Sequence, residues 1–191
     1  MDNKILIEQS QHWEKSFSSK PEMFGSEPSH SAKIALENFK KNNVKHIIEL
    51  GAGLGRDTIF FAKNSIKVTA LDYSPTAVEI IKNKSNSLGL NDLIEVQTHD
   101  LRQKLNFKDN SFDGCYSHML YCMAFTHSEL ENLNTEVCRV LNKDSLNIYT
   151  VRNHSDADYK KGTHRGEDLY EMNGYIVCLL YTSPSPRDDG V

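Results

Sequence analysis

The chain has 191 residues, 38% of them hydrophobic and 25% charged, which is the composition of one globular domain. Its formal net charge of −4 disfavours a nucleic-acid partner, because a mildly acidic chain gains little from counterion release. No apolar run approaches the roughly 20 residues that a transmembrane helix needs, and the N-terminus lacks the apolar segment of a secretion signal. We therefore expect no membrane association and a cytoplasmic location.

The first part of the chain has helical character. Pro21 and the stretch 24–28 interrupt it, because proline and glycine break regular structure. Beyond them, Ser29 or Ser31 can cap a second helix. We expect residues 1–43 to form an N-terminal helical lid.

From residue 44 onward, short apolar runs alternate with helical segments. Ser74 and Pro75 are typical of a helix start and Gly89 of a helix end. In the helix that follows the first strand, Phe60 is expected to face the sheet, and a later helix is expected over 129–141. This alternation predicts an α/β fold with a doubly wound, mainly parallel sheet. The predicted strands cover residues 44–50, 66–71, 93–97, 112–117 and 146–151.

The loop after the first predicted strand contains Gly51, Gly53 and Gly55, a G-x-G-x-G pattern. Glycines let the backbone turn sharply and approach a ligand closely. Dinucleotide-binding enzymes use a similar loop, but with the pattern G-x-G-x-x-G. The strand here ends with Glu49, whose carboxylate suits a cationic group better than a pyrophosphate. Both features favour S-adenosyl-L-methionine, which carries an ammonium beside a sulfonium.

Two further acidic residues follow predicted strands. Asp72 ends the second strand, where a carboxylate can accept hydrogen bonds from both hydroxyls of a ribose. Nicotinamide-binding folds share this feature, so Asp72 does not discriminate between the two cofactors. Asp100 follows the third strand, where it can accept a hydrogen bond from an adenine amino group.

With these motifs the sequence resembles the class I S-adenosylmethionine-dependent methyltransferases over about residues 40–155, and we assign 44–155 to the cofactor-binding core. It looks most similar to small-molecule enzymes of the tellurite-resistance and thiopurine type. The resemblance implies a small-molecule acceptor and a monomer or homodimer. It rests on E-L-G-A-G-L-G-R-D (49–57), L-D-Y-S-P (71–75), H-D-L (99–101) and S-F-D-G-C-Y-S-H-M-L (111–120). The cofactor-binding residues that it implies are Glu49, Gly51, Ala52, Gly53, Asp72, Tyr73, Asp100, Leu101 and Ser117.

The sequence does not single out a catalytic residue. Methyl transfer from a sulfonium depends mainly on holding the two reactants in line, so no universal catalytic group is expected. The polar candidates after the fourth and fifth strands are His118, Tyr121 and Arg152; the arginine could orient an anionic acceptor or simply pair with a nearby carboxylate. No metal is expected, because no cysteines or histidines cluster at ligand spacing.

Two alternatives of other classes remain open from sequence. One is a nicotinamide-dependent oxidoreductase of Rossmann type, which the glycine spacing and Glu49 disfavour. The other is a non-catalytic nucleoside-binding protein, because a sheet with a ligand site need not perform chemistry.

The C-terminal part gives two further expectations. Residues 156–177 are expected to form a loop or lid, with 174–177 beginning the antiparallel hairpin with which the resembled family usually ends. Residues 178–188 resemble the translation of a sequencing-library adapter, so we expect 178–191 to be a non-native tail and the hairpin to be missing.

Overall fold

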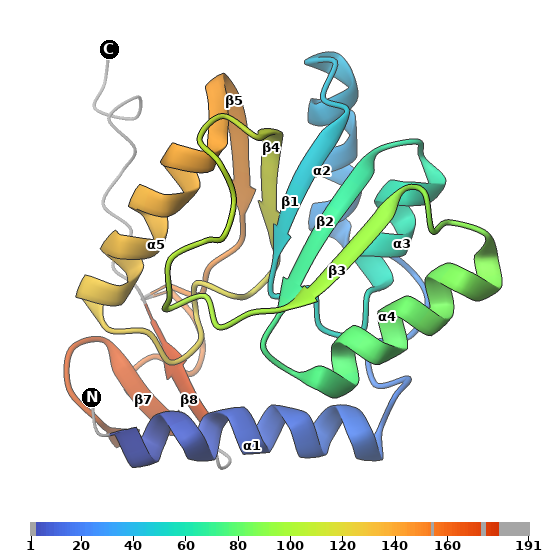
Figure 1. Cartoon of the computed structure of the whole chain (residues 1–191). Helices are drawn as coiled ribbons and strands as arrows, with labels where there is room; N and C mark the ends of the chain where they lie inside the picture. The colour runs from blue at the N-terminus through green and yellow to red at the C-terminus, as the bar shows by residue number, and fades with distance from the viewer. Residues whose placement is uncertain (1–2, 154, 173–174, 180–191) are drawn as a thin grey trace.

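The computed structural model describes residues 3–153, 155–172 and 175–179, and its centre is a five-stranded parallel sheet (Figure 1). The strand order is β3-β2-β1-β4-β5, so the order reverses between β1 and β4. Ligands bind at such a reversal, outside the carboxyl ends of the strands. The predicted doubly wound, mainly parallel sheet is therefore confirmed. Its strands are β1 (His46–Leu50), β2 (Lys67–Asp72), β3 (Ile94–Thr98), β4 (Phe112–Ser117) and β5 (Leu141–Tyr149).

Helix boundaries follow from local capping chemistry. The Ser29 hydroxyl accepts a hydrogen bond from the Ala32 N–H at 3.0 Å, so Ser29 rather than Ser31 caps the second helix. Ser74 caps the fourth helix in the same way, and Gly89 ends it in the left-handed conformation, as predicted. The helices are α1 (Asn3–Ser19), α2 (His30–Lys41), α3 (Arg56–Lys63), α4 (Pro75–Leu88) and α5 (His127–Val140).

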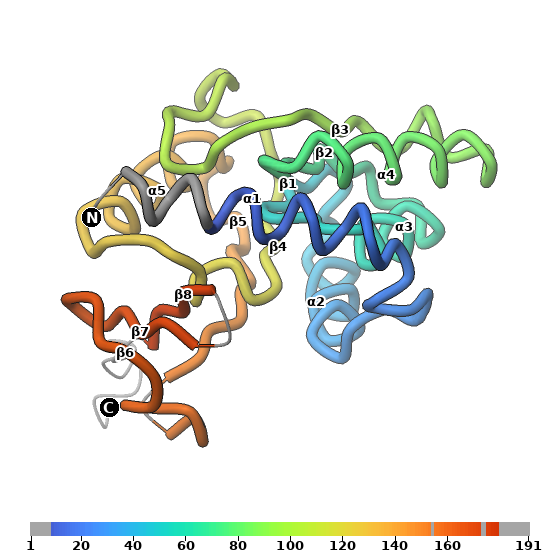
Figure 2. The backbone as a smooth tube through the Cα atoms, turned by 90° about the horizontal axis from the view of Figure 1, so that it is seen from below, coloured from blue at the N-terminus to red at the C-terminus, as the bar shows by residue number. Residues whose placement is uncertain are grey.

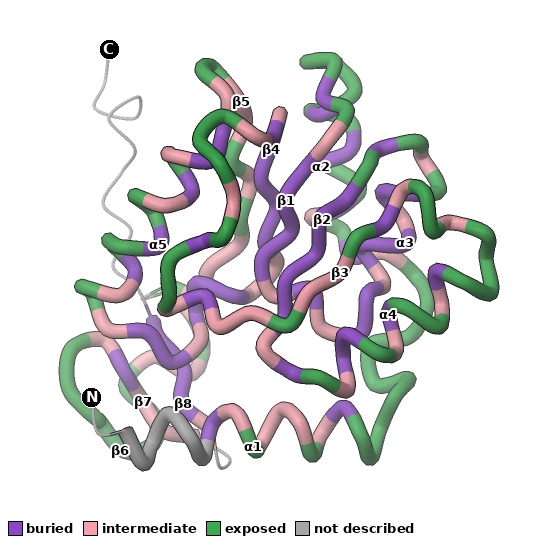
Figure 3. The backbone as a smooth tube through the Cα atoms, viewed as in Figure 1, coloured by how far each residue is buried: buried purple, intermediate pink, exposed green. Residues whose placement is uncertain are grey.

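Helices cover both faces of the large sheet. Figure 2 shows α2, α3 and α4 on one side of the strands and α5 on the other. Each side has its own apolar core: Phe39 and Phe61 pack on the first face, and Leu133 and Val137 on the second. Figure 3 shows that burial is deepest along β1, β2 and β4. The two covered faces leave the strand ends as the accessible edge of the sheet.

Helix α1 and a small antiparallel sheet lie across the carboxyl ends of the strands (Figures 1 and 2). Gln9 ties α1 to this sheet, because its side chain accepts from the Ile176 N–H at 2.8 Å. Glu14 ties α1 to the start of α4 through the hydroxyls of Ser74 and Thr76. The small sheet has the strand order β6-β7-β8, and its strands are β6 (Thr163–His164), β7 (Leu169–Met172) and β8 (Tyr175–Cys178).

Several local predictions were wrong. Phe61, not Phe60, is the fully buried phenylalanine of α3. β5 begins at Leu141, five residues before the predicted start, directly at the end of α5. Residues 175–178 pair antiparallel with β7 instead of beginning a hairpin beside β5, and no described strand pairs with the outer edge of β5.

The structure divides the proposed N-terminal lid. Helix α1 lies over the strand ends, whereas α2 contributes Ala32, Ala35 and Phe39 to the core. Of the proposed tail, Cys178 ends β8, Leu179 is buried, and 180–191 lie outside the described residues. Within the part of the chain that the structure describes, no helix is both long enough and apolar enough to cross a bilayer.

Candidate functional site

A cavity of about 280 Å³ opens at the carboxyl ends of β1, β2 and β4, between the sheet, α1 and β8. Its wall is mostly apolar, with a small set of charged side chains. Seven of the nine predicted cofactor residues lie on its wall, and five of them come from the first strand and its loop or from the end of the second: Glu49, Gly51, Ala52, Gly53 and Asp72. Tyr73 and Leu101 line it as well. The other lining residues are Trp13, Phe17, Phe24, Leu54, Arg56, Asp57, His118, Met119, Leu120, Met123, Arg152, Tyr175 and Val177.

The glycine loop has a backbone that other residues would strain. Gly51 has φ +71 and Gly53 has φ +54, both in the left-handed region. The N–H groups of Gly51 and Ala52 both donate to the Leu71 carbonyl, at 2.8 and 3.1 Å, which holds the loop against β2. A Cβ at Gly51 would lie 3.0 Å from Cδ1 of Leu120. The loop therefore passes close to the segment after β4 without filling the cavity.

Glu49 is a buried carboxyl group in the cavity wall. Its Oε2 accepts a hydrogen bond from the Thr58 hydroxyl at 2.6 Å. Burial, with the nearby charge of Asp57, raises the pKa of Glu49 to about 8. Without a ligand the group is therefore mostly protonated at pH 7, and a cation beside it would favour its ionised form.

Asp72 joins the cavity to the glycine loop. Its Oδ2 accepts from the Gly53 N–H at 2.8 Å and its Oδ1 from the Ser74 N–H at 2.9 Å. Burial raises the pKa of this carboxyl group, although both hydrogen bonds favour the ionised form. Each carboxylate oxygen has a second lone pair, so Asp72 can still accept from two hydroxyls of a ligand.

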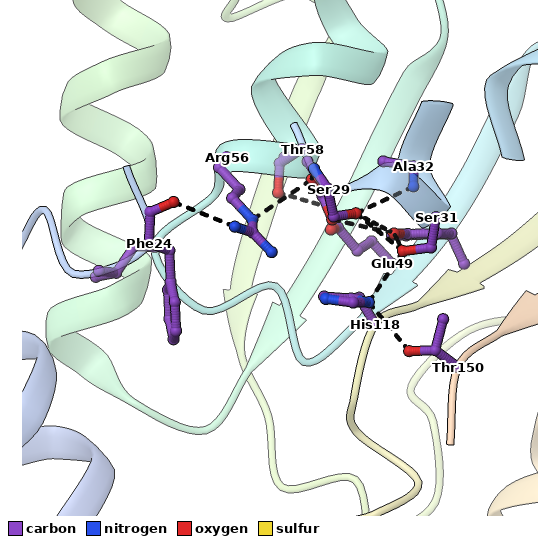
Figure 4. Close-up of polar contacts among 12 residues, drawn as sticks. Phe24, Ser29, Ser31, Ala32, Glu49, Arg56, Thr58, His118 and Thr150 are labelled. Atoms are coloured by element: carbon purple, nitrogen blue, oxygen red, sulfur yellow. Dashed lines mark hydrogen bonds and ion pairs between the residues drawn. The ribbon is translucent and has the colours of Figure 1, made fainter. Parts of the chain in front are cut away.

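Arg56 and Asp57, which begin α3, also line the cavity, although no role was predicted for them from the sequence. The Arg56 guanidinium donates to the Phe24 carbonyl at 3.1 Å and lies 5.6 Å from the centre of the Phe24 ring (Figure 4). Asp57 is buried and accepts from the N–H and the hydroxyl of Ser29, each at 2.7 Å. Both residues belong to the G-x-G-x-G-R-D motif, so the signal was present, but nothing in the sequence showed that their side chains face the cavity.

The charged groups of the cavity favour a cationic ligand. Glu49, Asp57 and Asp72 are buried carboxyl groups, and Arg56 is the cavity-lining arginine near them. Arg152 adds little free positive charge, because Asp156 and Asp158 hold its guanidinium at 2.6–2.9 Å. A buried site rich in carboxyl groups is stabilised by a bound positive charge.

His118 extends from the segment after β4 into the cavity wall. Its Nδ1 lies 2.9 Å from the Ser31 hydroxyl and 3.0 Å from that of Thr150 (Figure 4). Burial lowers the pKa of His118; the charge of Arg56 acts in the same direction, and Asp57 opposes it. The imidazole is therefore neutral at pH 7, with one nitrogen anchored.

Aromatic side chains form the opposite wall. The Trp13 ring lies 5.6 Å from Phe17 and 5.8 Å from Tyr175, measured between centroids. Its indole N–H is buried and has no hydrogen-bond partner among the described residues. Met23, which precedes Phe24 in the sequence, is 41% exposed and does not line the cavity.

Three predicted residues do not line the cavity. Arg102 holds the Asp100 carboxylate through two side-chain hydrogen bonds, at 2.8 and 2.6 Å. Ser117 is fully buried at the end of β4, and its hydroxyl has no partner among the described residues. Tyr121 is a core residue whose hydroxyl donates to Asn134 at 3.1 Å. Arg152 reaches the wall, but its guanidinium is paired as described above.

Asp113, near the start of β4, has a structural role. Its Oδ2 accepts from the N–H groups of Lys45 and His46, at 3.1 and 3.0 Å, which joins β4 to the start of β1. Elsewhere in the described chain, no three His, Cys, Asp or Glu side chains come together as a metal site.

The fold and this cavity define a doubly wound α/β domain with a carboxyl-rich ligand cavity at its strand ends. Residues 47–144 match the family model of the methyltransferase domain, and the chain belongs to this family. S-adenosyl-L-methionine is accordingly the cofactor of the domain, as the motifs predicted.

Relatives of known description are similar over most of this chain. A 24-methylenesterol C-methyltransferase of Arabidopsis thaliana is 27% identical over 85% of the chain and 48% of its own length. A sterol 4-C-methyltransferase of Caenorhabditis elegans is 26% identical over 62% of the chain and 35% of its own length. The chain thus spans half or less of the curated relatives that it matches.

A solved structure shows the same fold. The structure of a geranyl diphosphate methyltransferase in complex with S-adenosylmethionine matches with a TM-score of 0.57, over 68% of this chain and 52% of the other. At 14% identity, this likeness concerns the fold alone.

The residues of this cavity fit the cofactor. The carboxyl groups of Glu49 and Asp57 suit the ammonium group at its amino-acid end, and Asp72 has free lone pairs for a ribose. The loop can approach closely because Gly51 and Gly53 carry no Cβ. The buried indole N–H of Trp13 has no acceptor among the described residues, so it is free to donate to a bound ligand.

Proposed function

We propose that this chain catalyses the transfer of a methyl group from S-adenosyl-L-methionine to a small-molecule acceptor. The observation that carries the proposal is the set of buried carboxyl groups, Glu49, Asp57 and Asp72, around a glycine loop at the reversal of strand order. Such a site provides acceptors for an ammonium and a ribose, and it leaves an apolar wall beside them.

In this proposal each residue near the glycine loop has a binding role. Gly51, Ala52 and Gly53 line the amino-acid end of the cofactor and Glu49 faces its charge. Asp72 accepts the ribose hydroxyls, and Tyr73 and Leu101 border the adenine. Asp100 is retained as a candidate for the adenine amino group, and it would have to exchange part of its pairing with Arg102.

The remaining wall supports an acceptor with an apolar body. Met119, Leu120 and Met123 line the cavity after β4, and Phe24 and Tyr175 face it from other segments. Thioethers and aromatic rings adapt to apolar ligands of irregular shape. The named relatives act on sterols, and this agrees with the character of the wall. We further propose that the acceptor is not a nucleic acid and that the protein is a monomer or homodimer.

The bound cofactor would supply a methyl group already activated for in-line displacement at its sulfonium. The chain's contribution is to hold the acceptor at contact distance and in line, an effect that can supply about 7–11 kcal/mol. Helix α1 and β8 cover the strand ends (Figure 1). With cofactor and acceptor bound, this cover would limit the access of water and so strengthen the electrostatic interactions in the cavity.

Two measurements test the proposal. Calorimetric titration with S-adenosylhomocysteine should give saturable binding, and titration with NAD should give none; the reverse result would favour the oxidoreductase alternative. Incubation with methyl-labelled cofactor and a cell extract, split into lipid and polar fractions, should label a small molecule in the lipid fraction. Binding without any labelled product would favour the non-catalytic alternative.

A further inference from the structure

A chain of hydroxyl groups, the half-buried Ser31 and the buried Tyr116, connects His118 to the carboxylate of Asp57. The Ser31 hydroxyl lies 2.9 Å from Nδ1 of His118 and 2.9 Å from the Tyr116 hydroxyl. The Tyr116 hydroxyl donates to Oδ2 of Asp57 at 3.0 Å. The chain crosses from α2 through β4 to α3, so its members are brought together only by the tertiary structure.

The direction of the hydrogen bonds follows from counting donors. An ionised carboxylate only accepts, so the Tyr116 hydroxyl gives its proton to Asp57. The Ser29 hydroxyl also donates to Oδ2 of Asp57, at 2.7 Å. Tyr116 and Ser29 therefore present only oxygen lone pairs to the Ser31 hydroxyl. A Ser31 proton directed toward Tyr116 or Ser29 satisfies one of these oxygens and leaves the Ser31 oxygen to accept from Nδ1 of His118, whereas a proton directed at Nδ1 would leave both oxygens facing lone pairs.

This arrangement favours one tautomer of His118. With the Ser31 oxygen as an acceptor, Nδ1 carries the proton and Nε2 carries a lone pair. Nε2 has no hydrogen-bond partner among the described residues, and Figure 4 shows it turned away from both Ser31 and Thr150. Because His118 lines the cavity, this lone pair is available to a ligand there.

We propose that His118 is the general base of the reaction, acting through Nε2, and that Ser31, Tyr116 and Asp57 are positioning residues that hold it in the required tautomer. This inference rests on the proposed methyl transfer and adds that the acceptor reacts through a hydroxyl or an amine. The O–H or N–H bond of the acceptor breaks, its electron pair stays on the acceptor, and the proton joins the lone pair of Nε2. The imidazolium then returns the proton to solvent.

The groups around His118 suit this role. Asp57, reached through the hydroxyl chain, stabilises the imidazolium that forms, and burial together with Arg56 keeps the ring neutral beforehand. Tyr116 is the other titratable group in contact with the chain; burial, with the charge of Asp57, raises its pKa, so it stays protonated. The neutral imidazole of His118, linked to the Asp57 carboxylate through hydroxyl groups, is thus able to accept a proton at neutral pH.

Nuclear magnetic resonance of the 15N-histidine-labelled protein, without any ligand, tests the tautomer directly. The wild type should show His118 with protonated Nδ1 and unprotonated Nε2. Ser31→Ala should move the population toward protonated Nε2, because Thr150 is then the hydroxyl left at Nδ1, and its oxygen already accepts from the Met119 N–H at 2.8 Å. Thr150→Val, which removes the other hydroxyl, should leave the wild-type tautomer. A wild type with protonated Nε2, or equal spectra for the two variants, would overturn the proposal.

The catalytic part is tested with His118→Gln, with His127→Gln as the control because His127 is exposed on α5 and lies outside the cavity wall. His118→Gln should bind S-adenosylhomocysteine within about threefold of the wild type, while labelling of the lipid fraction falls by about 10²–10⁴-fold. The control should match the wild type in both. Undiminished labelling by His118→Gln would reject the general base alone, whereas a wild type that does not bind S-adenosylhomocysteine would reject the proposed function itself.

Discussion

The two sides of the cavity are built in different ways. On the glycine-loop side, Glu49, Gly51, Gly53 and Asp72 come from the ends of two adjacent strands, and hydrogen bonds join their loops. On the side around His118, the wall is assembled from segments that are far apart in the sequence. They are α1, the loop at Phe24, residues 118–123, Arg152 and β8.

The difference explains why one side carries recognisable motifs and the other does not. Loops after adjacent parallel strands meet at the same edge, so short motifs are enough to specify their ligand. A wall built from distant segments depends on how α1 and β8 pack, and no local pattern encodes that packing. Substitutions on the two sides should accordingly have separable effects, the first on cofactor affinity and the second on methyl transfer.

The largest effect on affinity is expected for Asp72→Ala. Two hydrogen bonds from ribose hydroxyls to a carboxylate contribute about 1.5–3 kcal/mol each, so affinity for S-adenosylhomocysteine should fall roughly 100-fold or more. Calorimetry measures this, and Asp92→Ala, at an exposed carboxylate, is the control. Unchanged affinity in Asp72→Ala would contradict the proposal that the glycine-loop side binds the cofactor.

Glu49→Gln should lower the affinity for S-adenosylmethionine by about tenfold at pH 8, because a charged hydrogen-bond acceptor is replaced by a neutral one. With a pKa of about 8 in the free protein, Glu49 should release a proton when a cation binds. Wild-type affinity should therefore rise between pH 6 and 8, and the variant should not show this rise. Binding heats that do not depend on the buffer would contradict the proton release.

The same group predicts how stability varies with pH. The pKa of Glu49 is raised from 4.5 in the unfolded chain to about 8 in the folded one, so the folded state binds more protons between these values. Its contribution to stability is fully present below pH 4.5 and is lost as the pH rises through 8. Thermal unfolding of Glu49→Gln should show a smaller loss over this range than the wild type.

A smaller effect is expected for Gly51→Ala, compared with Gly89→Ala. Both glycines have positive φ, so both variants should lose about 1 kcal/mol or more of folding free energy. Only the Cβ at Gly51 meets a neighbour, Leu120 at 3.0 Å, whereas Gly89 faces open space. Affinity for S-adenosylhomocysteine should fall severalfold in Gly51→Ala and stay unchanged in Gly89→Ala. Equal losses of affinity in the two variants would show that the ligand does not need a close approach of the backbone at Gly51.

The smallest effect is expected for Met123→Ala, on the His118 side. Binding of S-adenosylhomocysteine should change by less than about twofold, because Met123 lies on the segment after β4, far from the glycine loop in the sequence. The pattern of labelled lipids should change instead, since an apolar side chain of the proposed acceptor wall is shortened. A loss of cofactor affinity as large as that of Gly51→Ala would show that the two sides are not separable.

Local chemistry made much of the fold predictable. β4 and α4 were predicted at their observed bounds. The bounds of α4 were predictable because Ser74, Pro75 and Gly89 act through their immediate neighbours. The start of α5 was missed by two residues, although Thr126 and Glu129 form a capping box there. Phe60 was preferred over Phe61 because both fit an amphipathic pattern, and only the angle at which α3 meets the sheet separates them.

The sequence alone determined the class of the fold, the glycine loop and seven of the residues that line the cavity, because these depend on strand order and on contacts within a few residues. Only the tertiary structure decided that Arg102 holds Asp100, that Asp156 and Asp158 pair with Arg152, and that Tyr121 lies in the core. It alone placed Ser31 and Tyr116 between His118 and Asp57. A hydrogen bond forms between groups that are close in space, and the distances between segments joined by long connections are set by the packing of the whole core.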